Sequence, residues 1–309
     1  MRVLTAAEAA GARAAHEERA DALTAAHRER KQRGEKHAVE DFLFTYYPFS
    51  PARLRRWHPG WRVGYEASAD LDADGNPAIA DVDEAGRRSW YVDEAGPEGT
   101  PAVRRADVER YLDERASAFS FMTRLLRAST LTRRRPEFGC FGLHEWAMVY
   151  RQGEHRHPQP LRLGASGTDA VVEAHELRCT HFDAFRFFTA EAVPRNREPL
   201  RREDQAEREQ PGCLHAGMDV YKWAVKLGPL VPGELLLDAF ELASDARLLD
   251  MAAAPYDLSE FGVDPVRIET TEGKAEYVRR QRALAERSAR LREGILGSSF
   301  RAPSVAAVS

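Results

Sequence analysis

The sequence predicts a mainly α-helical protein with a small antiparallel β element in its N-terminal third. Apolar residues recur at helical spacing over most of the 309 residues, whereas short β-type runs separated by turns are confined to about 61–92. A hydrophobic fraction of 43% and a charged fraction of 30% are typical of a folded globular chain. We expect a peripheral charged helix over 1–36, a single helical domain with the β insertion over 37–297, and a flexible tail over 298–309.

The N-terminal third combines a charged helix with the predicted strands. Residues 5–35 are rich in alanine and in charged side chains, which predicts a long, solvated helix. Ser50 and Pro51 form a favourable N-cap and N1 pair, and we expect them to open a short basic helix. The runs Trp61–Glu66 and Arg88–Val92 are the predicted strands.

A turn-rich segment between these two strands resembles the start of a calcium loop. It begins Asp-Ala-Asp-Gly-Asn-Pro at Asp72, but Asp83 stands at the twelfth position, where a bidentate glutamate is needed. The pattern predicts no helix pair on either side of it. We therefore interpret the segment as an acidic surface turn.

Helical spacing also predicts the main elements of the remaining chain. Pro211 and Gly212 break a charged stretch and precede a helix that is apolar around most of its circumference, as expected for a buried helix. The predicted helices are Asp107–Arg127, Leu143–Tyr150, Leu214–Leu227, Glu234–Met251 and Glu272–Leu296.

Composition bears on where in the cell the protein is expected to work. No apolar run approaches the roughly 20 residues that would span a bilayer, and the N-terminus turns acidic too soon for a secretory signal. The 3 cysteines are an odd number, which fits a reducing compartment better than a disulfide framework. We therefore expect a cytoplasmic protein that does not bind membranes.

Net charge bears on the expected partner. The value of −4 shows no global basic excess of the kind that supports non-specific nucleic-acid binding. A small-molecule substrate is therefore the expected partner, with nucleic acid as an alternative that the net charge does not support. The sequence indicates no oligomeric state.

Three short apolar segments in the centre of the chain share one pattern. Phe138–Trp146, Cys179–Phe188 and Gly212–Trp223 each carry a cysteine just before a histidine, with a carboxylate close by. A charge taken out of water is unfavourable by several kcal/mol, on the order of magnitude, unless it is paired or ligated. These segments are therefore the predicted functional site.

The helix from Leu214 to Leu227 carries one narrow polar stripe. His215, Asp219, Lys222 and Lys226 follow one another at i, i+4, i+7 and i+11, so they share one face. Two interpretations remain open: the stripe lines a cavity, or it is a thin exposed edge on which Asp219 pairs with Lys222.

The other two segments add histidines and carboxylates of the same kind. His144 and Glu145 do not form a zinc-protease motif, because Met148 occupies the place of its second histidine. His181 and Asp183 lie among phenylalanines, and an ion pair of Asp183 with Arg186 is the structural alternative to a functional role.

Together these residues predict an enzyme acting on a small, planar or anionic molecule. Three hypotheses stay open for the pocket: a site for one or two divalent ions (zinc or non-haem iron), a metal-free acid-base pocket, and a buried structural network. A non-enzymatic binding protein is a further alternative, and no nucleotide-cofactor motif is present in the sequence. The catalytic candidates are His144, Glu145, His181, Asp183, His215 and Asp219. The metal candidates are His144, His181, His215 and Asp219, and the substrate-binding candidates are Lys222, Tyr221, Phe185 and Trp146.

Several of these stretches carry a resemblance. Phe42–Tyr47, Arg56–Gly60, Phe141–Tyr150, Cys179–Phe188 and Pro211–Asp219 resemble a family of actinobacterial proteins that often carry the label 3-methyladenine DNA glycosylase. The resemblance covers most of the chain and implies a DNA-repair N-glycosylase that releases alkylated purines.

The residues themselves do not supply the helix-hairpin-helix motif of such enzymes. Leu230–Glu234 reads Leu-Val-Pro-Gly-Glu, so the second glycine of the hairpin has no counterpart and an anion stands where a phosphate would approach. Asp238 comes too early to be the catalytic carboxylate of that motif. A glycosylase of another fold remains the alternative.

Overall fold

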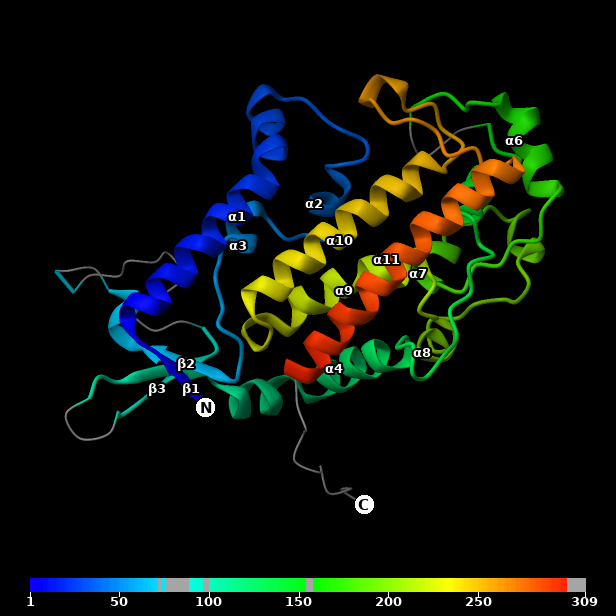
Figure 1. Cartoon of the computed structure of the whole chain (residues 1–309). Coiled ribbons are helices and arrows are strands. Elements are labelled where there is room, and N and C mark those ends of the chain that lie inside the picture. The colour runs from blue at the N-terminus through cyan, green and yellow to red at the C-terminus, as the bar shows by residue number, and fades with distance from the viewer. Residues whose placement is uncertain (72–73, 76–88, 97–99, 154–157, 299–309) are drawn as a thin grey trace, which may run out of the picture.

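Three long helices form the centre of the protein. The computed structural model describes residues 1–71, 74–75, 89–96, 100–153 and 158–298. Within them α9 (Leu214–Leu227), α10 (Gly233–Ala252) and α11 (Thr271–Ser298) pack against one another and run side by side (Figure 1). The prediction of a mainly α-helical fold is confirmed.

The N-terminal helix α1 (Ala6–Arg33) lies along the outside of this group and contacts α10 (Figure 1). It begins with a capping box in which Thr5 and Glu8 satisfy each other's backbone N–H groups, and it ends at Gly34 in the left-handed conformation. The helix is solvated on most of its surface, but one side is buried. The buried residues are Ala9, His16, Ala20 and Thr24.

A four-stranded sheet packs beside the N-terminal half of α1. The strands are β1 (Arg2–Leu4), β2 (Val63–Glu66), β3 (Tyr91–Glu94) and β4 (Val103–Ala106), in the order β1-β2-β4-β3. Strand β4 is antiparallel to both of its neighbours, whereas β1 is parallel to β2.

The sheet is therefore mixed, and the prediction of an antiparallel element is wrong for β1. A strand of three residues is too short to show alternation in the sequence, and its partner lies about sixty residues away across α1. Strand β4 also lies beyond the predicted β insertion of 61–92. The calcium-loop candidate that starts at Asp72 falls largely outside the described residues.

Shorter helices connect the three central helices, α1 and the sheet. Ser50 caps α3 (Pro51–Leu54) as predicted, with its side chain accepting the N–H of Arg53. Helix α5 (Leu143–Ala147) ends before the predicted Tyr150, and the chain continues as turns. The remaining helices are α2 (Phe42–Tyr46), α4 (Val108–Ala128), α6 (Gly164–Glu173), α7 (Phe182–Phe185) and α8 (Gln205–Arg208). The 3-10 helices are η1 (Ala67–Asp70), η2 (Val193–Arg195), η3 (Gly228–Leu230) and η4 (Ser259–Phe261).

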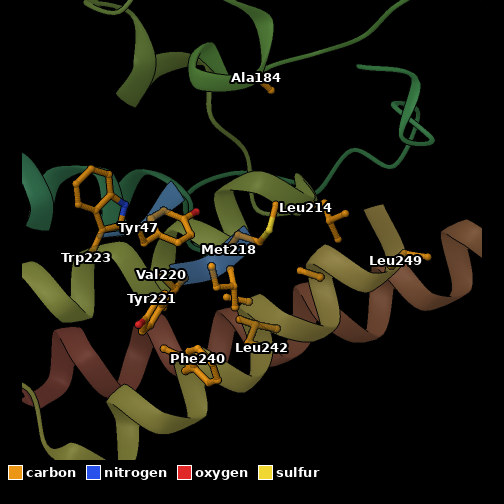
Figure 2. Close-up of a cluster of buried hydrophobic side chains, with 14 of the residues drawn as sticks. Tyr47, Ala184, Leu214, Met218, Val220, Tyr221, Trp223, Phe240, Leu242 and Leu249 are labelled. Atoms are coloured by element: carbon orange, nitrogen blue, oxygen red, sulfur yellow. The ribbon is translucent and has the colours of Figure 1, made fainter. Parts of the chain in front are cut away.

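Helix α9 is the centre of the hydrophobic core. Figure 2 shows Met218, Val220 and Tyr221 of α9 near Phe240 and Leu242 of α10, and all five side chains are buried. Burial of this kind contributes roughly 1.5–3 kcal/mol for each large apolar side chain. None of the helices in the described part of the chain combines the length and apolarity needed to cross a membrane.

Candidate functional site

The polar stripe of α9 faces the inside of the protein over its first three residues, whereas Lys226 at its C-terminal end is exposed. His215, Asp219 and Lys222 follow one side of the helix, where Asp219 is buried and the other two side chains are largely covered. The second interpretation of the stripe was an exposed edge on which Asp219 pairs with Lys222. The two side chains do pair, at 2.9 Å, but the pair lies in the interior.

Three histidines from three separate segments meet beside α9. The ring of His215 contacts that of His144, which α5 supplies, edge to face with centroids 4.5 Å apart. It stacks on the ring of His181, the residue before α7, with centroids 5.4 Å apart and planes 22° apart. The three apolar Cys-His segments therefore converge in space.

Each of the two outer histidines has its own buried carboxylate. Nε2 of His144 lies 2.7 Å from Oδ1 of Asp250 on α10. Nδ1 of His181 lies 3.0 Å from Oε1 of Glu209, which directly follows α8. Both carboxylates are at most 1% exposed. His215 is different, since its closest carboxylate oxygen among the described ion pairs is Oδ2 of Asp250 at 4.0 Å.

These neighbours divide the protonation states of the three rings. Burial disfavours a charged imidazole at His144, but Asp250 outweighs burial and holds the pKa of His144 well above its usual value. Burial acts in the same way on His181, and Glu209 outweighs it, so the pKa of His181 is also raised. Burial and then the positive charge of His144 hold the pKa of His215 well below its usual value. The pKa is thus raised for the two outer rings and lowered for the middle one.

Asp219 is the centre of a second set of contacts. Its Oδ1 accepts the hydroxyl of Tyr47 at 2.9 Å, and its Oδ2 accepts from Nζ of Lys222. Nζ of Lys222 also donates to Asp183 at 3.0 Å. Burial disfavours the Lys222 ammonium, but the two carboxylates outweigh burial and raise its pKa. Lys222 was predicted to bind the substrate, but its positive charge is already paired with two carboxylates.

Arg247 joins the site from α10 and was not predicted from the sequence. Its Nη1 donates to Oδ2 of Asp250 at 3.0 Å and to Oε1 of Glu145 at 3.4 Å. The guanidinium carbon lies 3.9 Å from the centre of the Phe42 ring. The side chain is 3% exposed, so these partners are needed to offset the unfavourable burial of its charge.

A cavity of about 350 Å³ opens onto this network. Three of the predicted catalytic residues, Glu145, Asp183 and His215, line it directly, whereas His144 and His181 lie behind His215. The other lining residues are Phe42, Thr45, Tyr46, Tyr47, Met148, Ala184, Phe187 and Arg247.

Three of the four predicted substrate-binding residues lie in the core. Trp146 is fully buried and donates its indole N–H to the carbonyl of Ala253. Tyr221 packs against Phe240, and Phe185 against Phe188. None of these three is among the residues that line the 350 Å³ cavity, whose aromatic side chains come instead from α2 and from the turn after α7.

Two groups of side chains could hold a metal ion. One is His144, His215 and Asp250, and the other is His181, Glu209 and Asp219; within each group the ligand atoms lie within 4.8 Å of one another. The four predicted metal ligands are therefore divided between two groups.

The distances within the first group fit a proton better than a metal. Two ligands on one tetrahedral zinc, each at about 2.0–2.1 Å, would lie about 3.3 Å apart. The 2.7 Å between His144 and Asp250 is a hydrogen-bond distance. His144 and Asp250 are therefore a hydrogen-bonded pair in this structure.

Comparisons with protein-family models, with curated proteins and with solved structures each give no match to this chain. The function is therefore inferred from the geometry of the site.

Proposed function

We propose that the protein is an enzyme that moves a proton to or from a small molecule bound in the 350 Å³ cavity, with His215 as the acid-base residue. One observation carries the proposal. Of the three clustered histidines, His215 is the one that lines the cavity, and no described side chain or carbonyl holds either of its ring nitrogens in a hydrogen bond.

The neighbouring residues suit His215 to act as a base. A neutral imidazole can accept a proton at neutral pH, and burial, followed by the positive charge of His144, keeps the pKa of His215 low. Asp250, whose Oδ2 lies 4.0 Å away, would stabilise the imidazolium that forms. A positioned acid-base residue contributes roughly 10²–10⁴-fold to the rate of a reaction.

The cavity supports a small molecule with a planar part as the substrate. Its volume lies within the range of about 300–1,000 Å³ that is usual for small-molecule sites. Phe42 and Tyr46 stack on each other at its wall, with ring centroids 5.0 Å apart. Aromatic walls of this kind favour planar ligands by stacking.

The test compares turnover in the wild type with turnover in His215→Gln. Each protein is incubated in D₂O with a panel of small metabolites, and proton NMR follows the loss of substrate or the exchange of carbon-bound protons. His175→Gln is the control, because His175 lies just after α6 and contacts the carbonyl of Val171 instead of the site. We expect the control to match the wild type and His215→Gln to be at least about 100-fold slower. Equal rates, or no compound changed by the wild type, would contradict the proposal.

Release of an alkylated base from DNA is the alternative that the sequence resemblance implies. The aromatic wall of the cavity would also suit a flipped base. Alkylated duplex DNA therefore belongs in the same panel, with an assay for released base. Release that is lost in His215→Gln would identify DNA as the substrate and leave the role of His215 intact.

A metal-dependent form of the enzyme is the second candidate. It is favoured by His181, whose Nδ1 lies close to Glu209 yet has no hydrogen bond with acceptable geometry. Elemental analysis of gently purified protein, with His144→Gln and His181→Gln beside it, tests this candidate. Stoichiometric zinc or iron that is lost in one of the variants would establish it.

A further inference from the structure

One edge of the Arg247 guanidinium has no hydrogen-bond partner in the described part of the chain. Its Nη1 is occupied by Asp250 and Glu145, but Nε and Nη2 are buried and have no hydrogen-bond partner among the described residues. A buried N–H group without an acceptor is unfavourable, so native proteins almost always provide one from protein, water or a ligand.

We propose that Arg247 binds an oxyanion, a carboxylate or a phosphate, through its Nε and Nη2 atoms, and that the substrate carries this group. The inference rests on the proposed function, because it names the substrate class of the same cavity. The two N–H groups on that edge of a guanidinium are parallel, and they match two oxygens of a carboxylate or phosphate.

The surroundings hold this edge in place. Phe42 covers one face of the guanidinium at 3.9 Å, and the two carboxylates fix the opposite edge. Asp250 is itself shared with His144, so its negative charge is not left to oppose a bound anion alone. The side chain is thus pre-organised, which lowers the entropic cost of binding.

The position of Arg247 links the anion to the proposed base. Arg247 and His215 both line the 350 Å³ cavity, and Nη1 of Arg247 and Nε2 of His215 both lie within 4.0 Å of Oδ2 of Asp250. In the proposal, a small molecule anchored by its oxyanion at Arg247 occupies the cavity that His215 also lines.

Other buried cations near the site do not offer this arrangement. Lys222 is held by Asp183 and Asp219. Arg292 donates to the carbonyl of Ala216 and to Ser288, and it does not line the 350 Å³ cavity. Arg247 also borders a second cavity of about 580 Å³ on the other side of α2, so the test must separate the two cavities.

Binding to the full chain tests the inference without knowledge of the reaction. The probes are benzoate, a planar carboxylate, inorganic phosphate, and benzamide as the neutral counterpart of benzoate, each titrated by calorimetry. We expect saturable binding of benzoate or phosphate and none of benzamide. Arg247→Lys should bind about tenfold more weakly, because lysine keeps the charge but loses one of the two parallel hydrogen bonds. Benzoate binding without phosphate binding would identify a carboxylate substrate, and the reverse a phosphate.

Two controls separate binding at Arg247 from binding elsewhere on the protein. Arg287→Gln changes a residue of the second cavity and should leave binding unchanged. In the wild type, the Nε–Hε NMR signal of Arg247 should shift on saturation with the bound probe, which needs no variant to fold. Absence of saturable binding, equal affinity in Arg247→Lys or an unmoved Arg247 signal would overturn the inference.

The variant His215→Gln separates this inference from the proposed function. It should still bind the probe, so loss of turnover with retained binding supports both proposals. Turnover without oxyanion binding refutes only the oxyanion site.

Discussion

The imidazole of His215 stacks on the imidazole of His181, with ring centroids 5.4 Å apart and the ring planes 22° from parallel. Two buried rings at this distance are not both charged without mutual repulsion. Glu209 lies beside His181 and raises its pKa, while His215 has no comparable partner among the described residues and its pKa is lowered, first by burial. In the proposed function, this asymmetry of the carboxylates leaves the ring at the cavity as the base.

Replacing His144 should change the proton affinity of His215. Burial is the first cause of the low pKa of His215, and the positive charge of His144 is the next. In His144→Gln that charge is absent and Asp250 is no longer shared with an imidazolium, so the pKa of His215 should rise. Nitrogen-15 NMR of the histidine rings as a function of pH measures the shift, with His27→Gln as a distant control. An unchanged or lower pKa would show that His144 is not charged in the folded protein.

Asp250 should contribute far more to stability than Asp245, which lies five residues earlier on α10. Asp250 is fully buried between His144 and Arg247, whereas Asp245 forms an exposed pair with Arg287. Removing one partner from a buried ionic network destabilises by about 3–5 kcal/mol, and from an exposed pair by about 0–1 kcal/mol. Urea unfolding of Asp250→Asn and Asp245→Asn measures the two costs. A similar loss of unfolding free energy in both variants would mean that Asp250 is not held in a buried ionic network with His144 and Arg247.

The sequence predicted the stripe on α9 because helical spacing alone places it. The helix was expected from Leu214 to Leu227 and has those bounds, so His215, Asp219 and Lys222 share one inward face, and Lys226 continues the stripe onto the exposed surface. The mainly α-helical class follows from the same periodicity. The parallel strand β1 was missed because its pairing depends on a contact between distant parts of the chain.

Asp250, Arg247 and Glu209 were missed because their roles depend on packing between separate helices. A signal for two of them was present: Arg247 and Asp250 are the charged residues within the otherwise apolar run 246–254, and they are three positions apart on a buried helix. Charged residues in such a run need buried partners, which the histidines supply. Glu209 follows a charged helix and gave no comparable signal.

His16 should contribute to a loss of stability as the pH drops below about 6.5. Burial lowers the pKa of His16, and its hydrogen bond to the Leu54 carbonyl offsets burial only in part. Below pH 6.5 the unfolded chain therefore binds a proton that the folded chain does not, and stability decreases by up to about 1.4 kcal/mol per pH unit. In His16→Gln this contribution is absent, so the free energy of unfolding measured at pH 7.5 and 5.5 should differ less than in the wild type. An equal difference would show that His16 makes no such contribution.

Two glycines should respond in opposite ways to alanine. A Cβ at Gly233, the first residue of α10, would lie 2.7 Å from Nδ1 of His16 and 3.3 Å from Trp57, so Gly233→Ala should destabilise by about 1–3 kcal/mol. A Cβ at Gly11 in α1 would meet nothing within 4 Å, so Gly11→Ala should stabilise by up to about 1 kcal/mol through helix propensity. Thermal unfolding of both variants measures the effects, and a stable Gly233→Ala would contradict the close packing of α1 against α10.

The charge states of the three clustered histidines decide whether His215 is the available base. Nitrogen-15 NMR of the histidine rings at pH 6.5, with signals assigned through His144→Gln, His181→Gln and His215→Gln, reports whether each ring is charged, neutral or bound to a metal. We predict that His144 and His181 are mostly charged and His215 mostly neutral at that pH. A charged His215, or three neutral rings with the shifts of metal ligands, would contradict the proposed acid-base site.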